Sequence, residues 1–184
     1  MRRFVLIAAM VVGLTVPADA EMSILSTNQL VEAAEYNDFD LVRSLLARGR
    51  DPDSVDSLGR TPLIIAANAG NEDIVELILK HGANRNKKDG SGNAALAYAA
   101  TRGHLGVTDL LLKMGADINV ENHQGMTPLM LAASEGWLDV IRFLLEQKAK
   151  TEISDFTGRT AMMWAQRTGK RAAIRVLQRA GVKE

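Results

Sequence analysis

The sequence predicts an all-α repeat solenoid, a stack of helix-turn-helix units joined by β-turn or hairpin loops. The main observation is a fixed period of 33 residues, at which three sets of small residues recur. These sets are Gly59, Gly92, Gly125 and Gly158; Ala66, Ala99, Ala132 and Ala165; and Gly70, Gly103, Gly136 and Gly169. Such self-similarity is typical of repeat proteins, in which each unit buries its apolar face only against its neighbours.

Each unit is predicted to contain two short helices. In the first full unit, Thr61 is a good N-cap, and Pro62 follows at the first helical position, where a missing N–H costs nothing. The first helix is expected to end at Gly70. A second apolar stripe, at 74–79, ends at Gly82. Glycine at both ends allows the left-handed conformation. The polar, glycine-rich stretch that follows is predicted to be an extended turn into the next unit.

The period and the residues that carry it resemble the ankyrin repeat family. The pattern D-x-x-G-x-T-P-L-H-x-A-A-x-x-G, with a second helix ending L-L-x-x-G-A-x-x-N, is met closely at 56–86 and again at 122–133. The resemblance covers about 23–184. It implies the following organisation: a partial repeat at about 23–55, full repeats at 56–88, 89–121 and 122–154, and a C-terminal capping repeat at 155–184. A fold of this kind hosts many functions, so it says little about the partner.

Several residues depart from the family pattern. The histidine after T-P-L is replaced at all four places, by Ile64, Ala97, Met130 and Met163. Ala94 replaces the capping threonine of its unit. Lys148 and Asn37 occupy glycine positions, and a left-handed lysine should cost about 1 kcal/mol. Asparagine tolerates that conformation better.

The first twenty residues are predicted to be a secretory signal peptide, residues 1–20. Arg2 and Arg3 form a charged start, an apolar run follows at 4–16, and Pro17 breaks it. The small residues around Asp19 supply a cleavage pattern, so cleavage is expected after Ala20. The features look bacterial and favour the periplasm as the destination. The alternative is an uncleaved anchor or a buried helix, although the run is shorter than a comfortable membrane span.

The amino-acid composition excludes several kinds of functional site. Among 184 residues there are 22 basic and 22 acidic side chains and no cysteine. Disulfides, cysteine-ligated metals and a thiol nucleophile are therefore excluded, and the global basic signature of nucleic-acid binding is missing. His81, His104 and His123 lie at different repeat positions without metal-ligand spacing. We expect no enzyme, no metal and no cofactor.

The resemblance implies that a partner binds the concave side, formed by turn tips and first helices. The period maps the following residues onto that side: Glu35, Tyr36, Leu58, Arg60, Asn68, Arg102, His123, Gln124, Met126, Glu135, Phe156, Arg159 and Arg167. Leu58, Met126 and Phe156 are apolar at tips where no core is expected, and aromatic and arginine side chains are enriched at binding hot spots. Tyr98 and Trp164 share a repeat position and are expected in the core. Trp137 is expected to be half-buried.

Charge is unevenly distributed along the chain. Residues 21–59 carry eight acidic and three basic side chains, whereas 159–184 carry seven basic and one acidic. Arg171, Arg175 and Arg179 share one face of the last predicted helix and, with Lys170, form a basic patch. This patch is either a solvated capping face or a docking site for an acidic partner, an anionic lipid or a wall polymer.

The predicted function is a non-enzymatic protein–protein interaction module in the periplasm, which escorts, stabilises or inhibits a periplasmic enzyme. We expect a monomer that binds another protein, with no nucleic-acid partner and at most a minor membrane association. One alternative is an envelope-associated adaptor that binds an anionic lipid or polymer through the basic C-terminal helix. Another is a secreted effector that binds a host protein.

Overall fold

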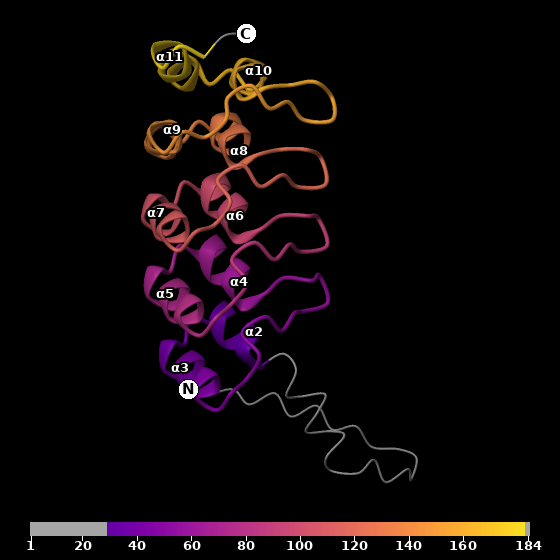
Figure 1. Cartoon of the computed structure of the whole chain (residues 1–184), viewed down its shortest axis with the longest axis vertical. Coiled ribbons are helices and arrows are strands. Elements are labelled where there is room, and N and C mark those ends of the chain that lie inside the picture. Colours follow the sequence, from indigo (N-terminus) through magenta and orange to yellow (C-terminus); the bar gives the residue numbers. More distant parts are fainter. Residues whose placement is uncertain (1–28, 183–184) are drawn as a thin grey trace, which may run out of the picture.

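The structure is a computed structural model that describes residues 29–182. Its regular elements within that range are ten helices, arranged as five consecutive pairs in one stack (Figure 1). The first helices of the pairs are α2 (Gln29–Glu35), α4 (Pro62–Ala69), α6 (Ala95–Arg102), α8 (Pro128–Glu135) and α10 (Ala161–Arg167). The second helices are α3 (Phe39–Ala47), α5 (Glu72–Lys80), α7 (Leu105–Lys113), α9 (Leu138–Glu146) and α11 (Arg171–Arg179). The all-α repeat solenoid is confirmed.

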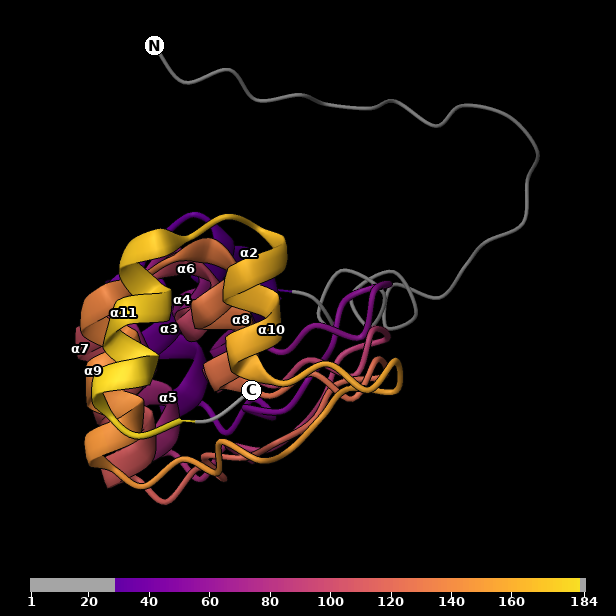
Figure 2. The same cartoon turned by 90° about the horizontal axis from the view of Figure 1, so that it is seen from above.

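The stack has two helical layers and a row of loops. First helices contact the first helices of neighbouring units, and second helices contact second helices. The long loops project from the side of the first helices and lie one above another along the stack (Figures 1 and 2). The loops and the first helices therefore share one side of the molecule, which we refer to as the inner face. The second helices form the outer layer.

The helix ends follow the sequence closely. Thr61 and Thr127 begin α4 and α8 and accept hydrogen bonds from the backbone N–H groups three residues later. Ala94, at the same position before α6, makes no side-chain cap, as its replacement of threonine predicts. Lys148 and Asn37 have φ of 63° and 59°, so both take the left-handed conformation expected of the glycines they replace.

Alanines on the first helices allow the units to approach closely. The alanines that recur with the 33-residue period, Ala66, Ala99, Ala132 and Ala165, are all 0 % exposed. Leucine and isoleucine side chains from both layers fill the space around them, as with Leu63 and Ile78. A methyl side chain permits close helix contact, and the larger side chains remove most apolar surface from water.

Met126 lies in this core, so the expectation of an exposed side chain at a turn tip is wrong. It is 6 % exposed and belongs to the same buried cluster as Leu129 and Met130. The physical reason is its place directly before the N-cap Thr127, at the base of the loop rather than at its tip. Two hydrogen bonds with Asn122 close the turn there, and the flexible methionine side chain packs inward.

The predicted signal peptide, residues 1–20, lies outside the described residues. Among the helices of 29–182, none is long and apolar enough to cross a membrane.

Candidate functional site

One polar residue organises each loop of the inner face. Asp56 Oδ1 accepts the backbone N–H groups of Leu58 at 2.9 Å and Arg60 at 2.8 Å. The same pair of bonds recurs in the later units, from Ser91 and Asn93 to Asp89, from Gln124 and Met126 to Asn122, and from Thr157 and Arg159 to Asp155. Every loop is thus folded the same way by an acceptor at the start of its unit.

Backbone hydrogen bonds join consecutive loops. The N–H of Gly90 donates to the carbonyl of Leu58 at 3.0 Å, that of His123 to Ser91 at 3.2 Å, and that of Phe156 to Gln124 at 3.0 Å. A Cβ on Gly59, which has φ of 76°, would lie 3.0 Å from the N atom of Gly90. Glycine therefore permits this close approach, and the loops form one continuous rim joined by backbone hydrogen bonds.

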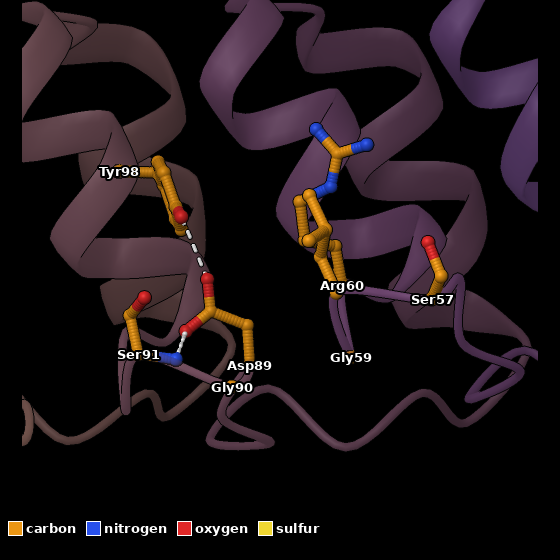
Figure 3. Close-up of a pocket in the computed structure, with 8 residues that line it drawn as sticks. Ser57, Gly59, Arg60, Asp89, Gly90, Ser91 and Tyr98 are labelled. Carbon is orange, nitrogen blue, oxygen red and sulfur yellow. Dashed lines mark hydrogen bonds between the residues drawn. The ribbon is translucent and has the colours of Figure 1, made fainter.

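A pocket of about 500 Å³ opens between the loops of the units that begin at Asp56 and Asp89 (Figure 3). Its lining comprises Ser57, Leu58, Gly59, Arg60, Asp89, Gly90, Ser91 and Tyr98. On one side the hydroxyl of Tyr98 donates to Asp89 Oδ2 at 2.6 Å (Figure 3). On the other, Arg60 Nε donates to Asp56 Oδ2 at 2.6 Å, and its Nη2 lies 3.7 Å from Glu35 Oε1.

These bonds shift the pKa values of Tyr98 and Asp56. Burial and the hydrogen bond to Asp89 raise the pKa of Tyr98 to about 12. Burial also acts to raise the pKa of Asp56, but its hydrogen bonds from Arg60 and from the N–H of Leu58 outweigh burial and lower it. Tyr98 is therefore a neutral phenol at neutral pH, and Asp56 and Arg60 form an ion pair. The pocket offers hydroxyl groups and a guanidinium whose charge is compensated.

A second pocket, of about 240 Å³, adjoins the first at Tyr98. Its lining comprises Asn68, Asn93, Ala97, Tyr98, Thr101, Arg102, Asn122, Gln124 and Leu131. Asn122 Nδ2 donates to Asn93 Oδ1 at 3.0 Å, and Arg102 Nε donates to Asn68 Oδ1 at 3.0 Å. We refer to the two adjoining pockets as the inner groove. Its lining includes many polar side chains, four of them carboxamides, and comes from three successive units.

Two residues that the sequence singled out serve the stack itself. His104 Nε2 lies 3.1 Å from the carbonyl of Asn68, and Trp137 Nε1 donates to the carbonyl of Thr101 at 2.8 Å. The two rings occupy the same repeat position and link consecutive units. Trp137 is 45 % exposed, so its ring is more open to solvent than the half-buried expectation. Within 29–182 no group of three His, Asp or Glu side chains is arranged to hold a metal ion.

The structure brings some of the predicted partner-binding residues together and leaves others apart. Those that line the inner groove are Leu58, Arg60, Asn68, Arg102 and Gln124, and Glu35 borders it through Arg60. Arg159 and Arg167 lie further along the inner face, around Trp164. Outside both groups are exposed side chains that line neither pocket, namely Tyr36, His123, Glu135 and Phe156. The basic patch lies apart from the inner groove, on the outer layer. Lys170 directly precedes α11, and Arg171, Arg175 and Arg179 are exposed on that helix.

Sequence reasoning missed the polar role of Tyr98 and Trp164. Both are half-buried against the core clusters, as their apolar bodies suggest, but their polar ends bond the loop aspartates. Each ring follows its aspartate by nine residues, and this spacing was the available signal. The expectation of two plain core residues is therefore corrected.

Comparison with known proteins agrees with this geometry. The family model described as Ankyrin repeats (3 copies) matches residues 30–122 and 106–183. A search of curated proteins found no match. Ankyrin repeats are typically non-enzymatic modules that mediate binding to other proteins. The matched segments span most of the sequence, and the chain therefore belongs to the ankyrin repeat family.

Proposed function

We propose that this protein is a non-enzymatic, periplasmic binding module whose inner groove holds a partner protein. The observation that carries the proposal is the pair of adjoining pockets that share Tyr98 and take their linings from three successive units. An open groove that spans three units and carries many polar side chains suits a segment of polypeptide better than a compact small molecule, which favours an enclosed cavity.

The groove chemistry supports a peptide partner. Carboxamides such as Asn93 and Gln124 carry both donors and acceptors, which match the N–H and C=O groups of a peptide backbone. Arg102 is exposed, lines the groove and donates from Nε to Asn68 Oδ1, so its guanidinium is held at the groove surface. Leu58, 62 % exposed at the rim, adds apolar contact. A stable interface buries about 800 Å² on each partner, so the loop rim beside the groove takes part as well.

The N-terminal pattern supports the periplasmic location. The charged start, the apolar run at 4–16 and the small residues before Glu21 are the features of a cleaved secretory signal. A chain without cysteine also cannot form wrong disulfides in an oxidising compartment. We propose that the partner there is an enzyme that this protein escorts, stabilises or inhibits. N-terminal sequencing of the protein from a periplasmic fraction should begin at Glu21.

Affinity capture with residues 21–184 tests groove binding. A variant with Leu58→Ala, Arg102→Ala and Gln124→Ala removes groove contacts without touching the core. A matched control changes three exposed residues of the outer layer, Glu76, Arg142 and Arg175, to alanine. We expect one dominant protein to be captured by the wild type and the control but lost with the groove variant. Equal capture by all three, or loss only with the control, would contradict the proposal.

A second candidate function rests on the basic patch. Arg171, Arg175 and Arg179 are exposed on α11, and no acidic side chain of the described residues pairs with them. An envelope-associated adaptor would bind anionic lipid through this face. Such binding weakens steeply above about 0.15 M salt, where exposed charges are screened. If vesicles containing phosphatidylglycerol retain the wild type but not an Arg171→Glu, Arg175→Glu variant, the adaptor function is favoured.

A further inference from the structure

Arg159, near the C-terminal end of the inner face, differs from its counterpart Arg60. The two arginines occupy the same repeat position, each four residues after a loop aspartate. In the earlier unit, Asp56 Oδ2 accepts Nε of Arg60 at 2.6 Å. In the last unit, Asp155 Oδ2 instead accepts the indole N–H of Trp164 at 2.9 Å. Trp164 thus occupies the carboxylate oxygen that, in the earlier unit, pairs with the charge of the arginine.

Both carboxylate oxygens of Asp155 already accept hydrogen bonds within its own unit. Its Oδ1 accepts the N–H and the hydroxyl of Thr157 and the N–H of Arg159, all within 2.9 Å. The residue is 5 % exposed, so its charge faces the loop backbone rather than solvent. Across the described residues, no carboxylate lies within ion-pair distance of Arg159 or Arg167. Arg159 and Arg167 therefore give this part of the inner face a positive charge.

Both guanidiniums lie against the indole ring of Trp164. The Cζ atom of Arg159 is 5.7 Å from the ring centroid, and that of Arg167 is 5.4 Å from it. Arg159 also donates to the hydroxyl of Thr157. Stacking on an aromatic face orients a planar guanidinium and leaves N–H donors at its edge free. The ring therefore holds two arginines in place without neutralising either.

We propose that Arg159, Trp164 and Arg167 form an anion subsite, which takes an aspartate or glutamate side chain of the partner protein. Guanidinium edges match a carboxylate in bidentate geometry, which gives both strength and orientation. The subsite occupies the repeat positions that Arg60, Tyr98 and Asn68 fill in the inner groove, so it continues the same surface toward the C-terminal end. The inference rests on the proposed function and defines the partner as an acidic polypeptide segment.

A protein carboxylate is favoured over a lipid by the place of the subsite. Arg159 lies at the base of its loop, directly before the N-cap Thr160, and it is half-buried. The loop tip beyond it presents Phe156, which is 74 % exposed. A flat membrane would meet the tips and the outer arginines of α11 first, whereas a polypeptide that follows the groove reaches the subsite.

The test is fluorescence anisotropy with a labelled octaglutamate peptide and residues 21–184 at low ionic strength. Arg159→Gln with Arg167→Gln should weaken binding about tenfold or more, because two charge-assisted pairs are lost. Arg175→Gln with Arg179→Gln removes the same charge from α11, and we expect a change of less than about twofold. The indole N–H resonance of Trp164 should shift on addition of the peptide, and that of Trp137 should not. Thermal unfolding confirms that both variants fold.

Equal weakening by the two double variants would overturn the proposal, because it would show attraction to net charge alone. Failure of octaglutamate to bind the wild type would also overturn it, as would phosphatidylglycerol vesicle binding that depends on Arg159 and Arg167. Affinity capture separates this inference from the proposed function. If the subsite alone is wrong, the Arg159→Gln, Arg167→Gln variant captures the partner as well as the wild type does, while the groove variant loses it. If groove binding is wrong, the groove variant captures the partner unchanged.

Discussion

Trp164 donates its indole N–H to Asp155 Oδ2 at 2.9 Å, and this bond ties helix α10 to the base of its own loop. The equivalent bond two units earlier runs from the hydroxyl of Tyr98 to Asp89 Oδ2 at 2.6 Å. In both units the aspartate also accepts two backbone N–H groups of the loop. One buried carboxylate thus sets both the loop conformation and the orientation of the ring on the inner face.

Asp155 should make stability depend on acid pH. Burial raises its pKa, but the hydrogen bonds from Thr157, Arg159 and Trp164 outweigh burial and lower the pKa to about 2. A depressed pKa means that the carboxylate stabilises the fold above pH 3.8, its ordinary pKa, and that this stability is lost as pH falls through about 2. Urea unfolding of Asp155→Asn should show a loss of about 2 kcal/mol at pH 7 and almost none near pH 2.

Asp117→Asn is the matched control for that experiment. Asp117 Oδ1 accepts the N–H of Asn119 in an exposed turn, and Asn84 performs the same role one unit earlier. The control should therefore change the free energy of unfolding by less than about 0.5 kcal/mol. An Asp155→Asn variant as stable as the wild type at pH 7 would contradict the role assigned to this carboxylate.

Gly103 should tolerate alanine less well than Gly82. Both are left-handed, with φ of 76° and 85°, so each substitution costs about 1 kcal/mol of backbone strain. A Cβ on Gly103 would lie 2.5 Å from the ring of Trp137, whereas nothing lies within 4 Å of one on Gly82. Gly103→Ala should cost about 1–3 kcal/mol more in chemical denaturation. In a Trp137→Ala background, Gly103→Ala and Gly82→Ala should cost nearly the same. If Gly103→Ala still costs more there, the ring of Trp137 is not responsible.

Lys148→Gly should stabilise the protein. The lysine has φ of 63° after α9, in a conformation that glycine adopts without strain. We expect a gain of about 1 kcal/mol in the free energy of unfolding. Asn37→Gly, at φ of 59°, should gain less, because asparagine already tolerates this region. Equal effects at the two positions would show that side-chain strain is not the cause.

Tyr98 should titrate only in strong base. Burial and the bond to Asp89 raise its pKa from 10 to about 12. The stability from this bond is thus complete below pH 10 and lost as pH rises through about 12. In a Tyr36→Phe variant only Tyr98 can form a phenolate, so ultraviolet absorbance follows it alone. Asp89→Asn should lower the midpoint, and an unchanged midpoint would assign the shift to burial alone.

Local features of the fold could be predicted from the sequence, and features that depend on neighbouring units could not. The helix starts at Thr61 and Thr127 and the left-handed Lys148 follow from single residues and the 33-residue period. The expectation of an exposed Met126 was wrong because its place directly before the N-cap Thr127 puts it at the base of the loop. The bond from Trp137 to Thr101 crosses 36 residues, and its partner is a backbone carbonyl that no sequence pattern marks.

The same limit applies to the candidate site. The period placed Arg60, Asn68 and Arg102 on the inner face, where the structure has them. It could not show that Arg60 is compensated by Asp56 while Arg159 is not, because that difference depends on which donor reaches the second carboxylate oxygen. This competition takes place within one unit, and the 33-residue period does not mark which donor reaches the carboxylate oxygen.

Photo-cross-linking from an introduced cysteine tests groove binding most directly, because the chain has no cysteine of its own. A benzophenone label on Ser91→Cys sits in the inner groove, and the same label on Glu76→Cys sits on the exposed outer layer. We expect the captured partner to cross-link from Ser91→Cys and not from Glu76→Cys. Cross-linking from Glu76→Cys alone, or equally from both, would contradict binding in the groove.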